Sequence, residues 1–312
     1  MRGIVPALLF IAAVTFPLFY QDYWLYVATI GLYYAILASS WSMLAGQVGL
    51  ISFAHAAFAG IGAYTSGLLV IHLDLPIPVG MAAGALAAAP FGLGIGALTL
   101  RMRGPYLALT TLAFSEIFRI FITAEYGLTQ GSIGLKVPLM FGGSKPLSYY
   151  TGLGLFLVTV VTLSGVLRSR VGLFLVAMRE DEDGAETRGV NTVFYRLIAF
   201  VLTSAFAGLA GGYYAHVVGL VSPQMTRIGE MGLILAMSVF GGLESLLGAA
   251  LGAIILQGLT EYLRIFTEWR LAIFGALVLF TLKFAPEGIL PSLYTSADRL
   301  VHRWWGRGAQ SP

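Results

Sequence analysis

The chain has 312 residues, of which 58% are hydrophobic and 11% are charged, and its formal net charge at pH 7 is +3. Soluble domains carry about 25% charged residues, so the composition excludes an ordinary soluble protein. The small net charge argues against a nucleic-acid partner. The absence of cysteine excludes disulfides, zinc–thiolate sites and iron–sulfur clusters.

Apolar segments recur along the whole chain, and a helix needs about 20 apolar residues to cross a bilayer. We predict one all-α polytopic membrane domain over residues 1–312, with about ten transmembrane or re-entrant helices. The abundant glycines suit closely packed membrane helices. The first segment is expected to be a retained helix rather than a signal peptide. The predicted spans lie near residues 4–20, 24–45, 48–72, 76–100, 105–124, 148–167, 197–220, 231–243, 245–263 and 268–284.

Basic residues indicate the orientation of the chain, because cytoplasmic loops are enriched in lysine and arginine. They cluster near the N-terminus, at Arg101 and Arg103, through residues 168–196 and in the tail 285–312. These segments, with both termini, are predicted to be cytoplasmic, and the loop 125–147 to be external. The tail returns to the cytoplasm only if residues 231–263 cross twice, once as a short, glycine-broken segment.

The external loop is rich in glycine, serine and proline. Loops of this length are usually functional or disordered, so the loop could form the mouth of a pathway or contact an external partner. A plain surface loop is an equal alternative. The candidate residues of the mouth are Gly131, Ser132 and Gly134.

An internal similarity joins residues 49–58 (GLISFAHAAF) to residues 242–251 (GLESLLGAAL), which share Gly, Leu, Ser and two alanines at the same offsets. Transporters are commonly built from such repeats, with glycine-interrupted segments at matching positions marking the pathway. We predict a repeat, whose inverted or parallel sense the pattern does not distinguish. Chance similarity between small-residue helices is the alternative. Gly242 and Ser245 are therefore pathway or packing candidates.

Residues 46–63 (GQVGLISFAHAAFAGIGA) are expected to form one helix with a smooth glycine face. That helix could line or gate a pathway. Close helix packing is the alternative, with the polar side chains satisfied by neighbouring carbonyls. The candidates are Gly46, Gly49, Ser52, His55 and Gly60.

Glu116 lies in the middle of a predicted span, with Arg119 one turn later. An ionisable residue inside a span is a functional hypothesis by default. A purely structural i,i+3 ion pair is the alternative. A proton relay would need more such groups in series than the spans contain, so proton coupling is not supported.

Motifs of catalysis are missing from the sequence. There is no Walker loop, metal-ligand cluster, nucleophile elbow or HExxH motif. We predict a protein without catalytic or metal site, without a cofactor of its own and without enzyme activity. Any energy for transport must come from an ion gradient or from another subunit.

The segment 168–196 holds five arginines and five carboxylates, which lipid would not accept. A short apolar run, Val171 to Met178, precedes the carboxylates. Acidic residues followed by an arginine suit the dipole of a short helix, and Asn191 suits the N-cap of the next span. We expect one or two short helices that dock a partner, with a merely solvated surface as the alternative.

Several motifs of this chain make a family recognisable. Asp183, Gly184 and Ala185, followed by Gly189, resemble the Glu-Ala-Ala…Gly loop of ABC-importer permeases, with the first two positions replaced. The wider sequence is similar to branched-chain amino acid ABC transporter permeases of the M type. The similarity is carried by GLFLVAMREDEDGAETRGVNTVFYRLIAFVLTSAFAGLAGGYYAH, GQVGLISFAHAAFAGIGAYTSGLL, GPYLALTTLAFSEIFR, GSIGL and FAPEGIL.

The resemblance implies a multi-pass protein of a bacterial cytoplasmic (inner) membrane, which pairs with a second, related permease. Two ATP-binding subunits would use ATP and magnesium, and an external substrate-binding protein would deliver leucine, isoleucine or valine. Residues 172–190 would form the coupling helix. The coupling residues implied are Arg179, Glu180, Asp181, Glu182, Asp183, Gly184, Ala185 and Gly189.

The alternatives are a urea, short-amide or sugar permease of the same ABC type, or a self-sufficient secondary transporter. The external loop differs from that of many family members, because Gln130 and Gly131 stand where two consecutive glycines and a polar residue are common. This difference bears on the identity of the solute.

Overall fold

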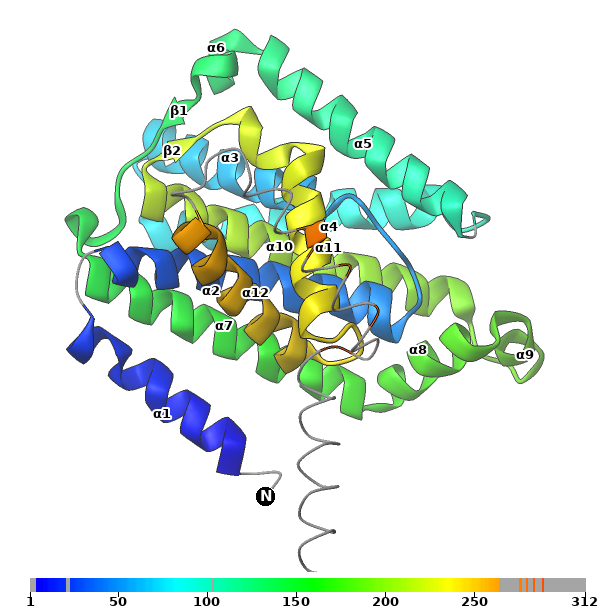
Figure 1. Ribbon diagram of the computed structural model, residues 1–312. Coiled ribbons are helices and arrows are strands. Elements are labelled where there is room, and N and C mark those ends of the chain that lie inside the picture. The colour runs from blue at the N-terminus through cyan, green and yellow to red at the C-terminus, as the bar shows by residue number, and fades with distance from the viewer. Residues whose placement is uncertain are drawn as a thin grey trace, which may run out of the picture.

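The computed structural model describes residues 4–20, 23–102 and 104–263, together with residues 275, 276, 279, 283 and 288. The predicted span 268–284 and the tail 285–312 therefore lie almost wholly outside the described residues. The described elements (Figure 1) are α1 Ile4–Phe19, α2 Tyr23–Ser42, the π-helix η1 Met43–Gln47, α3 His55–Leu73, α4 Ile77–Leu98, α5 Pro105–Ala124, α6 Tyr126–Thr129, η2 Gly131–Ile133, β1 Leu135–Lys136, η3 Met140–Gly143, α7 Lys145–Arg168, α8 Arg170–Glu180, α9 Glu182–Thr187, α10 Thr192–Val218, β2 Leu220–Val221, η4 Pro223–Thr226, α11 Ile228–Gly241 and α12 Leu246–Tyr262.

The long helices form a bundle in which α10 occupies the centre and packs against α2, α3 and α4. Helix α12 packs against α2 and α11, and α7 packs against α2. Helix α1 lies at the edge and contacts α7, where the Tyr149 hydroxyl donates to the carbonyl of Ala13 at 2.8 Å. Figure 1 shows α8 and α9 at one end of the bundle and α6, β1 and β2 at the opposite end.

Local sequence explains where the helices begin and end. Helix α5 starts at Pro105, which is compatible with the first helical turn because its missing N–H would have no partner there. Asn191 caps α10, accepting a hydrogen bond from the Phe194 amide at 3.0 Å. Gly219 ends the same helix at φ +76°, a left-handed conformation that glycine adopts without strain. The predicted N-cap at Asn191 is thus confirmed.

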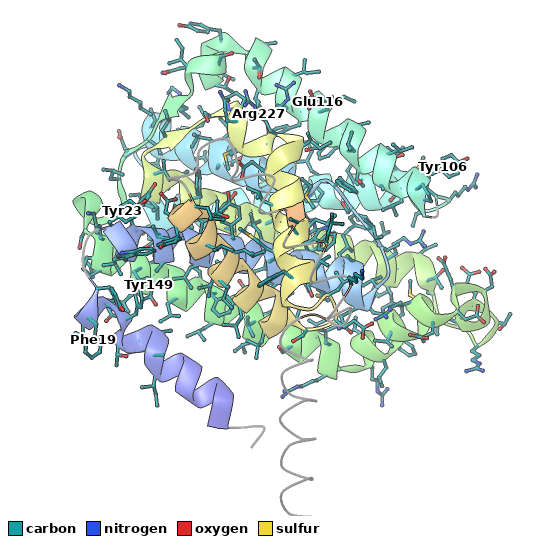
Figure 2. The ribbon with its side chains drawn as sticks, viewed as in Figure 1. Phe19, Tyr23, Tyr106, Glu116, Tyr149 and Arg227 are labelled. Atoms are coloured by element: carbon teal, nitrogen blue, oxygen red, sulfur yellow. The ribbon has the colours of Figure 1, made fainter. Side chains whose placement is uncertain are left out.

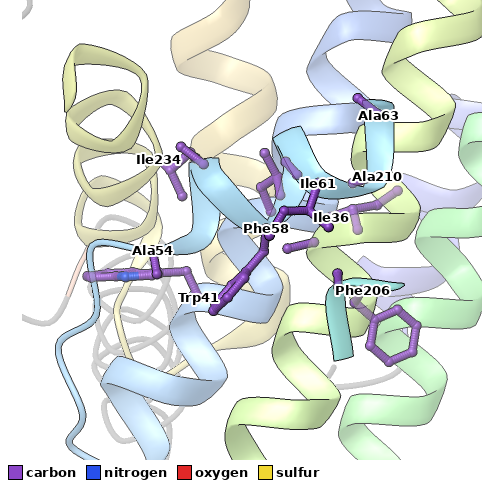
Figure 3. Packing of buried hydrophobic residues seen from close by; sticks show 14 of the residues in the cluster. Ile36, Trp41, Ala54, Phe58, Ile61, Ala63, Phe206, Ala210 and Ile234 are labelled. Atoms are coloured by element: carbon purple, nitrogen blue, oxygen red, sulfur yellow. The ribbon is translucent and has the colours of Figure 1, made fainter. Parts of the chain in front are cut away.

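The centre of the bundle depends on glycines that let helix backbones touch. A methyl group at Gly62 of α3 would overlap the carbonyl of Gly208 on α10, and one at Gly211 would overlap the carbonyl of Ala59. Gly84 of α4 faces Gly62 in the same way. Around these contacts, large side chains such as Trp41 and Phe58 fill a continuous core (Figure 3). Small residues at such crossings are how membrane helices gain close packing.

The described residues contain six helices that are long and apolar enough to cross a membrane, or seven if the bent pair α11–α12 counts as one span. Ten spans are therefore not confirmed, and neither is an internal repeat. The all-α, multi-pass architecture is confirmed. At 1.5 Å per residue, α11 and α12 are about 21 Å and about 26 Å long, less than the hydrocarbon thickness of about 30 Å. They meet at a bend of 118°.

The expectation of one helix over residues 46–63 is wrong. Helix α2 loosens into η1 at Met43–Gln47, residues 48–54 are not helical, and α3 begins at His55. Gly49 adopts φ +79°, which a right-handed helix does not allow. The hydrophobic pattern could not reveal this break, because the residues in it are as apolar as a span. The aligned segment 242–251 likewise begins in a break, at residues 242–245 between α11 and α12.

The segment 125–147, predicted to be the external loop, is folded. β1 pairs antiparallel with β2, so that Leu135 lies opposite Val221 and Lys136 opposite Leu220. The Val137 amide adds a hydrogen bond of 3.1 Å to the carbonyl of Gly219. The loop between α5 and α7 is thereby tied to the end of α10.

The glycine contacts generate a stability prediction. Gly62→Ala should lower the free energy of unfolding by roughly 1–3 kcal/mol, because the added methyl overpacks the crossing of α3 and α10. Gly94→Ala on α4 is the matched control, since no described atom lies within 4 Å of a methyl group there. It should be neutral or stabilising by up to about 1 kcal/mol, the difference in helix propensity. Thermal unfolding of the detergent-solubilised variants measures both, and equal shifts would contradict the packing argument.

Candidate functional site

The charged segment 168–196 folds into two short helices at one end of the bundle (Figure 1). Ser169 caps α8, and its hydroxyl accepts from the Val171 amide at 3.2 Å. Asp181 breaks the helix with an extended backbone, and its carboxylate caps α9 by accepting from the Gly184 amide at 3.0 Å. The apolar run Val171–Met178 lies within α8. The sequence therefore encodes each helix start with a polar cap.

Arg196 fastens this loop to the bundle. Its side chain is 5% exposed, and Nη1 donates to the carbonyl of Leu100, in the turn between α4 and α5, at 2.6 Å. Nη2 forms an ion pair with Glu182 of α9. A cavity of about 310 Å³ opens between this turn, α9 and the start of α10. A buried charge is tolerated when it is paired and hydrogen-bonded, and here the pairing fixes the position of α9.

Arg179 and Glu244 form an ion pair between the end of α8 and the break that separates α11 from α12. The same guanidinium donates to the carbonyl of Gly46 in η1 at 2.5 Å. The charged segment is thus attached to the bundle by two arginines, Arg179 from α8 and Arg196 from α10.

The other predicted coupling residues occupy different environments. Ala185 is the buried residue of α9, and Gly184 is half-buried and donates its amide to the Asp181 cap. Gly189 adopts φ +84°, with open space among the described atoms where a side chain would lie. Three carboxylates are exposed, although that of Asp181 serves as the cap: Glu180, Asp181 and Asp183.

A mixed apolar and charged face remains on the outside of this loop. Leu173 of α8 and Phe194 at the start of α10 are 70% and 54% exposed. Glu180, Asp183 and Arg188 are exposed on the same segment. The combination of large apolar side chains with charges of both signs suits contact with another protein.

The candidates around the first break are packed inside the chain. A methyl at Gly46 would overlap the carbonyl of Leu243, and one at Gly60 would overlap Thr226. Gly49 faces the Arg179 stem, and a methyl group added at Gly49 would lie 3.3 Å from Cγ of that side chain. Ser52 and His55 are fully buried.

Ser52 lies in the irregular segment, and its carbonyl accepts from Trp41 Nε1 at 2.7 Å. His55 is the first residue of α3, and its buried ring lies against the backbone of Ser40. A pathway role for these residues stays a prediction. Gly242 and Ser245 lie in the second break, where Gly242 adopts φ +119° and the Ser245 hydroxyl caps α12 by accepting from the Gly248 amide at 3.0 Å.

Glu116 lies on α5, the helix along the upper edge of the molecule in Figure 2. Its carboxylate pairs with Arg119, and the two side chains are 43% and 29% exposed. The structure does not bring this pair to either break. Gly131 and Gly134 are buried where the external loop turns, at φ +55° and +86°, whereas Ser132 is exposed.

His216 is not among the site residues predicted from the sequence, but it contacts several elements at the end of the bundle that carries β1 and β2. Its Nε2 lies 3.0 Å from the Ser66 hydroxyl, and its Nδ1 lies 2.8 Å from the carbonyl of Pro138. The ring therefore joins α3, α10 and the external loop. A single histidine within an apolar run was the available signal, and it does not indicate which partners the fold will supply.

The bundle of apolar helices, with a charged loop at one end, defines a multi-pass membrane protein. Residues 23–282 match the model of the family described as branched-chain amino acid transport system / permease component. The chain therefore belongs to this family of transport permeases.

Curated relatives agree with this assignment. The chain is 31% identical to the high-affinity branched-chain amino acid transport system permease protein LivM of Escherichia coli (strain K12), over 91% of this chain and 73% of that protein. It is 28% identical to the LivH permease of the same organism, over 84% of this chain and 92% of that protein. A probable LivM of Methanocaldococcus jannaschii is 25% identical over 72% of this chain and 69% of that protein. No solved structure matches the chain.

The attachment of α9 generates the second prediction. Arg196→Gln removes both the bond to Leu100 and the ion pair to Glu182, and breaking a buried pair costs about 3–5 kcal/mol. We expect backbone amides of residues 182–189 to exchange hydrogen at least about tenfold faster, because α9 opens locally. Hydrogen–deuterium exchange of the purified protein measures this, and Arg188→Gln on the exposed side is the control. Unchanged exchange in Arg196→Gln would show that other contacts hold α9.

Proposed function

We propose that the chain is the M-type permease subunit of an ATP-driven importer, which moves leucine, isoleucine and valine across the cytoplasmic membrane. The family match over residues 23–282 is the observation that carries this proposal. The relatives named for branched-chain amino acids, of both the LivM and the LivH type, support the choice of solute.

ATP binding and hydrolysis belong to partner subunits in this proposal. The sequence contains no Walker loop. The helices α8 and α9 provide the contact, with the face around Leu173, Phe194 and Arg188 seated on an ATP-binding subunit. A helix bundle that alternates between inward-facing and outward-facing states needs such a contact, because the energy of ATP hydrolysis on a partner subunit would otherwise not reach the bundle. The positive-inside rule, applied to the arginines of this segment, supports a cytoplasmic position for it.

A second permease completes the membrane part of the proposed complex. Escherichia coli has both a LivM and a LivH protein, and each aligns with most of this chain. Two permeases of one fold can therefore form the related pair. The half-buried ion pair of Glu116 and Arg119 on α5 supports a partner or a water-filled pathway at this helix, since lipid disfavours charged groups. An external binding protein would deliver the amino acid to the end that carries β1 and β2.

The proposal is tested by reconstitution in proteoliposomes with both permeases, the two ATP-binding subunits and the binding protein. We expect uptake of radiolabelled leucine that needs ATP and the binding protein. Omitting the ATP-binding subunits should abolish it. Uptake that persists without those subunits would indicate a secondary transporter. Uptake of urea but not leucine would indicate a short-amide permease.

The position of the ATP-binding subunit generates the third prediction. Because the chain contains no cysteine, a single cysteine gives one reactive position. In the assembled complex, Arg188→Cys treated with a thiol–amine cross-linker should give a product with an ATP-binding subunit. Lys136→Cys, an exposed site on β1 at the opposite end, should not. Electrophoresis and mass spectrometry identify the products. A transporting complex that gives no such product from Arg188→Cys would contradict the contact.

A further inference from the structure

The guanidinium of Arg179, on α8, contacts two breaks in the membrane helices at the same time. Nη1 donates to the carbonyl of Gly46 in η1 at 2.5 Å, and Nη2 pairs with the carboxylate of Glu244 between α11 and α12. The two breaks are about 200 residues apart in the sequence. A single side chain thus joins a loop outside the bundle to both interruptions inside it.

The two breaks are also bonded directly to each other. The Ser42 hydroxyl donates to the carbonyl of Leu243 at 2.6 Å, and Gln47 Nε2 donates to the carbonyl of Glu244 at 2.5 Å. Gly46 packs so closely on Leu243 that a methyl group would overlap its carbonyl. These contacts make one unit of the end of α2 and the bend of α11–α12.

Both breaks have the backbone properties of hinges. Gly49 and Gly242 adopt φ +79° and +119°, outside the helical region. A π-helix such as η1 is rare and is often found at functional sites. Carbonyls at the end of a helix lack a partner within it, and a positive charge placed there is favourable. Arg179 supplies such a charge to the carbonyl of Gly46.

We propose that Arg179 is the positioning residue that transmits movement of the coupling loop to these two breaks. The proposal rests on the proposed function, in which an ATP-binding subunit acts on α8 and α9. A displacement of α8 carries the guanidinium with it, and its two bonds move the end of α2 and the α11–α12 bend together. The planar, forked guanidinium can hold a carbonyl and a carboxylate at once, whereas a lysine ammonium offers a single point.

Four variants test this role in the reconstituted complex, with leucine transported per ATP hydrolysed as the readout. Arg179→Gln should lower that ratio about tenfold, which corresponds to about 1.4 kcal/mol of coupling free energy. Arg179→Lys and Glu244→Gln each keep one of the two contacts and should give intermediate ratios. Arg168→Gln, an exposed arginine at the end of α7 and outside α8 and α9, should leave the ratio unchanged.

The ratio separates transmission from a merely structural role. If Arg179 only stabilised the fold, its loss would lower the yield of complex, while each assembled complex would keep its ratio. An unchanged ratio in Arg179→Gln would therefore overturn the proposal. Failure of the unmodified complex to take up leucine with ATP would instead contradict the proposed function.

Discussion

Every backbone polar group inside a bilayer needs a partner within the protein, and this constraint governs the structure. Unbroken helices meet it alone and can then pack through glycines such as Gly62 and Gly208. A broken helix exposes carbonyls and amides that other residues must satisfy. Here the residues at the two breaks form hydrogen bonds with each other that meet much of this need. Arg179, from outside the bundle, donates a further hydrogen bond to the carbonyl of Gly46.

The class of fold and the helix ends followed from local sequence. Runs of apolar residues revealed α4, α5 and α7 with nearly correct limits, and Asn191 marked the start of α10. The break at residues 48–54 did not follow, because its residues are apolar and the contact beside it, of Gly46 with Leu243, joins segments far apart in the sequence. Hydropathy reports what lipid or a core will accept. It does not show where a helix ends because a neighbouring segment packs against it.

Composition places the charged segment outside the lipid and predicts its short helices, but it does not indicate the direction of its side chains. Arg179 and Glu182 were expected to belong to the surface that contacts a partner, yet both form ion pairs toward the bundle. The difference arises because both side chains lie within reach of an oppositely charged group on the bundle. The two kinds of residue look alike in sequence. Only the partners, Glu244 and Arg196, distinguish them.

The strand pair at the external end has a consequence for encounters with other molecules. Leu135 and Val221, together with the bonds of His216, hold the external loop in place without help from a partner. A protein that binds this surface meets a loop that is already ordered. Binding therefore costs little conformational entropy in the loop. A surface that is ordered in advance is compatible with both rapid binding and rapid release of a partner.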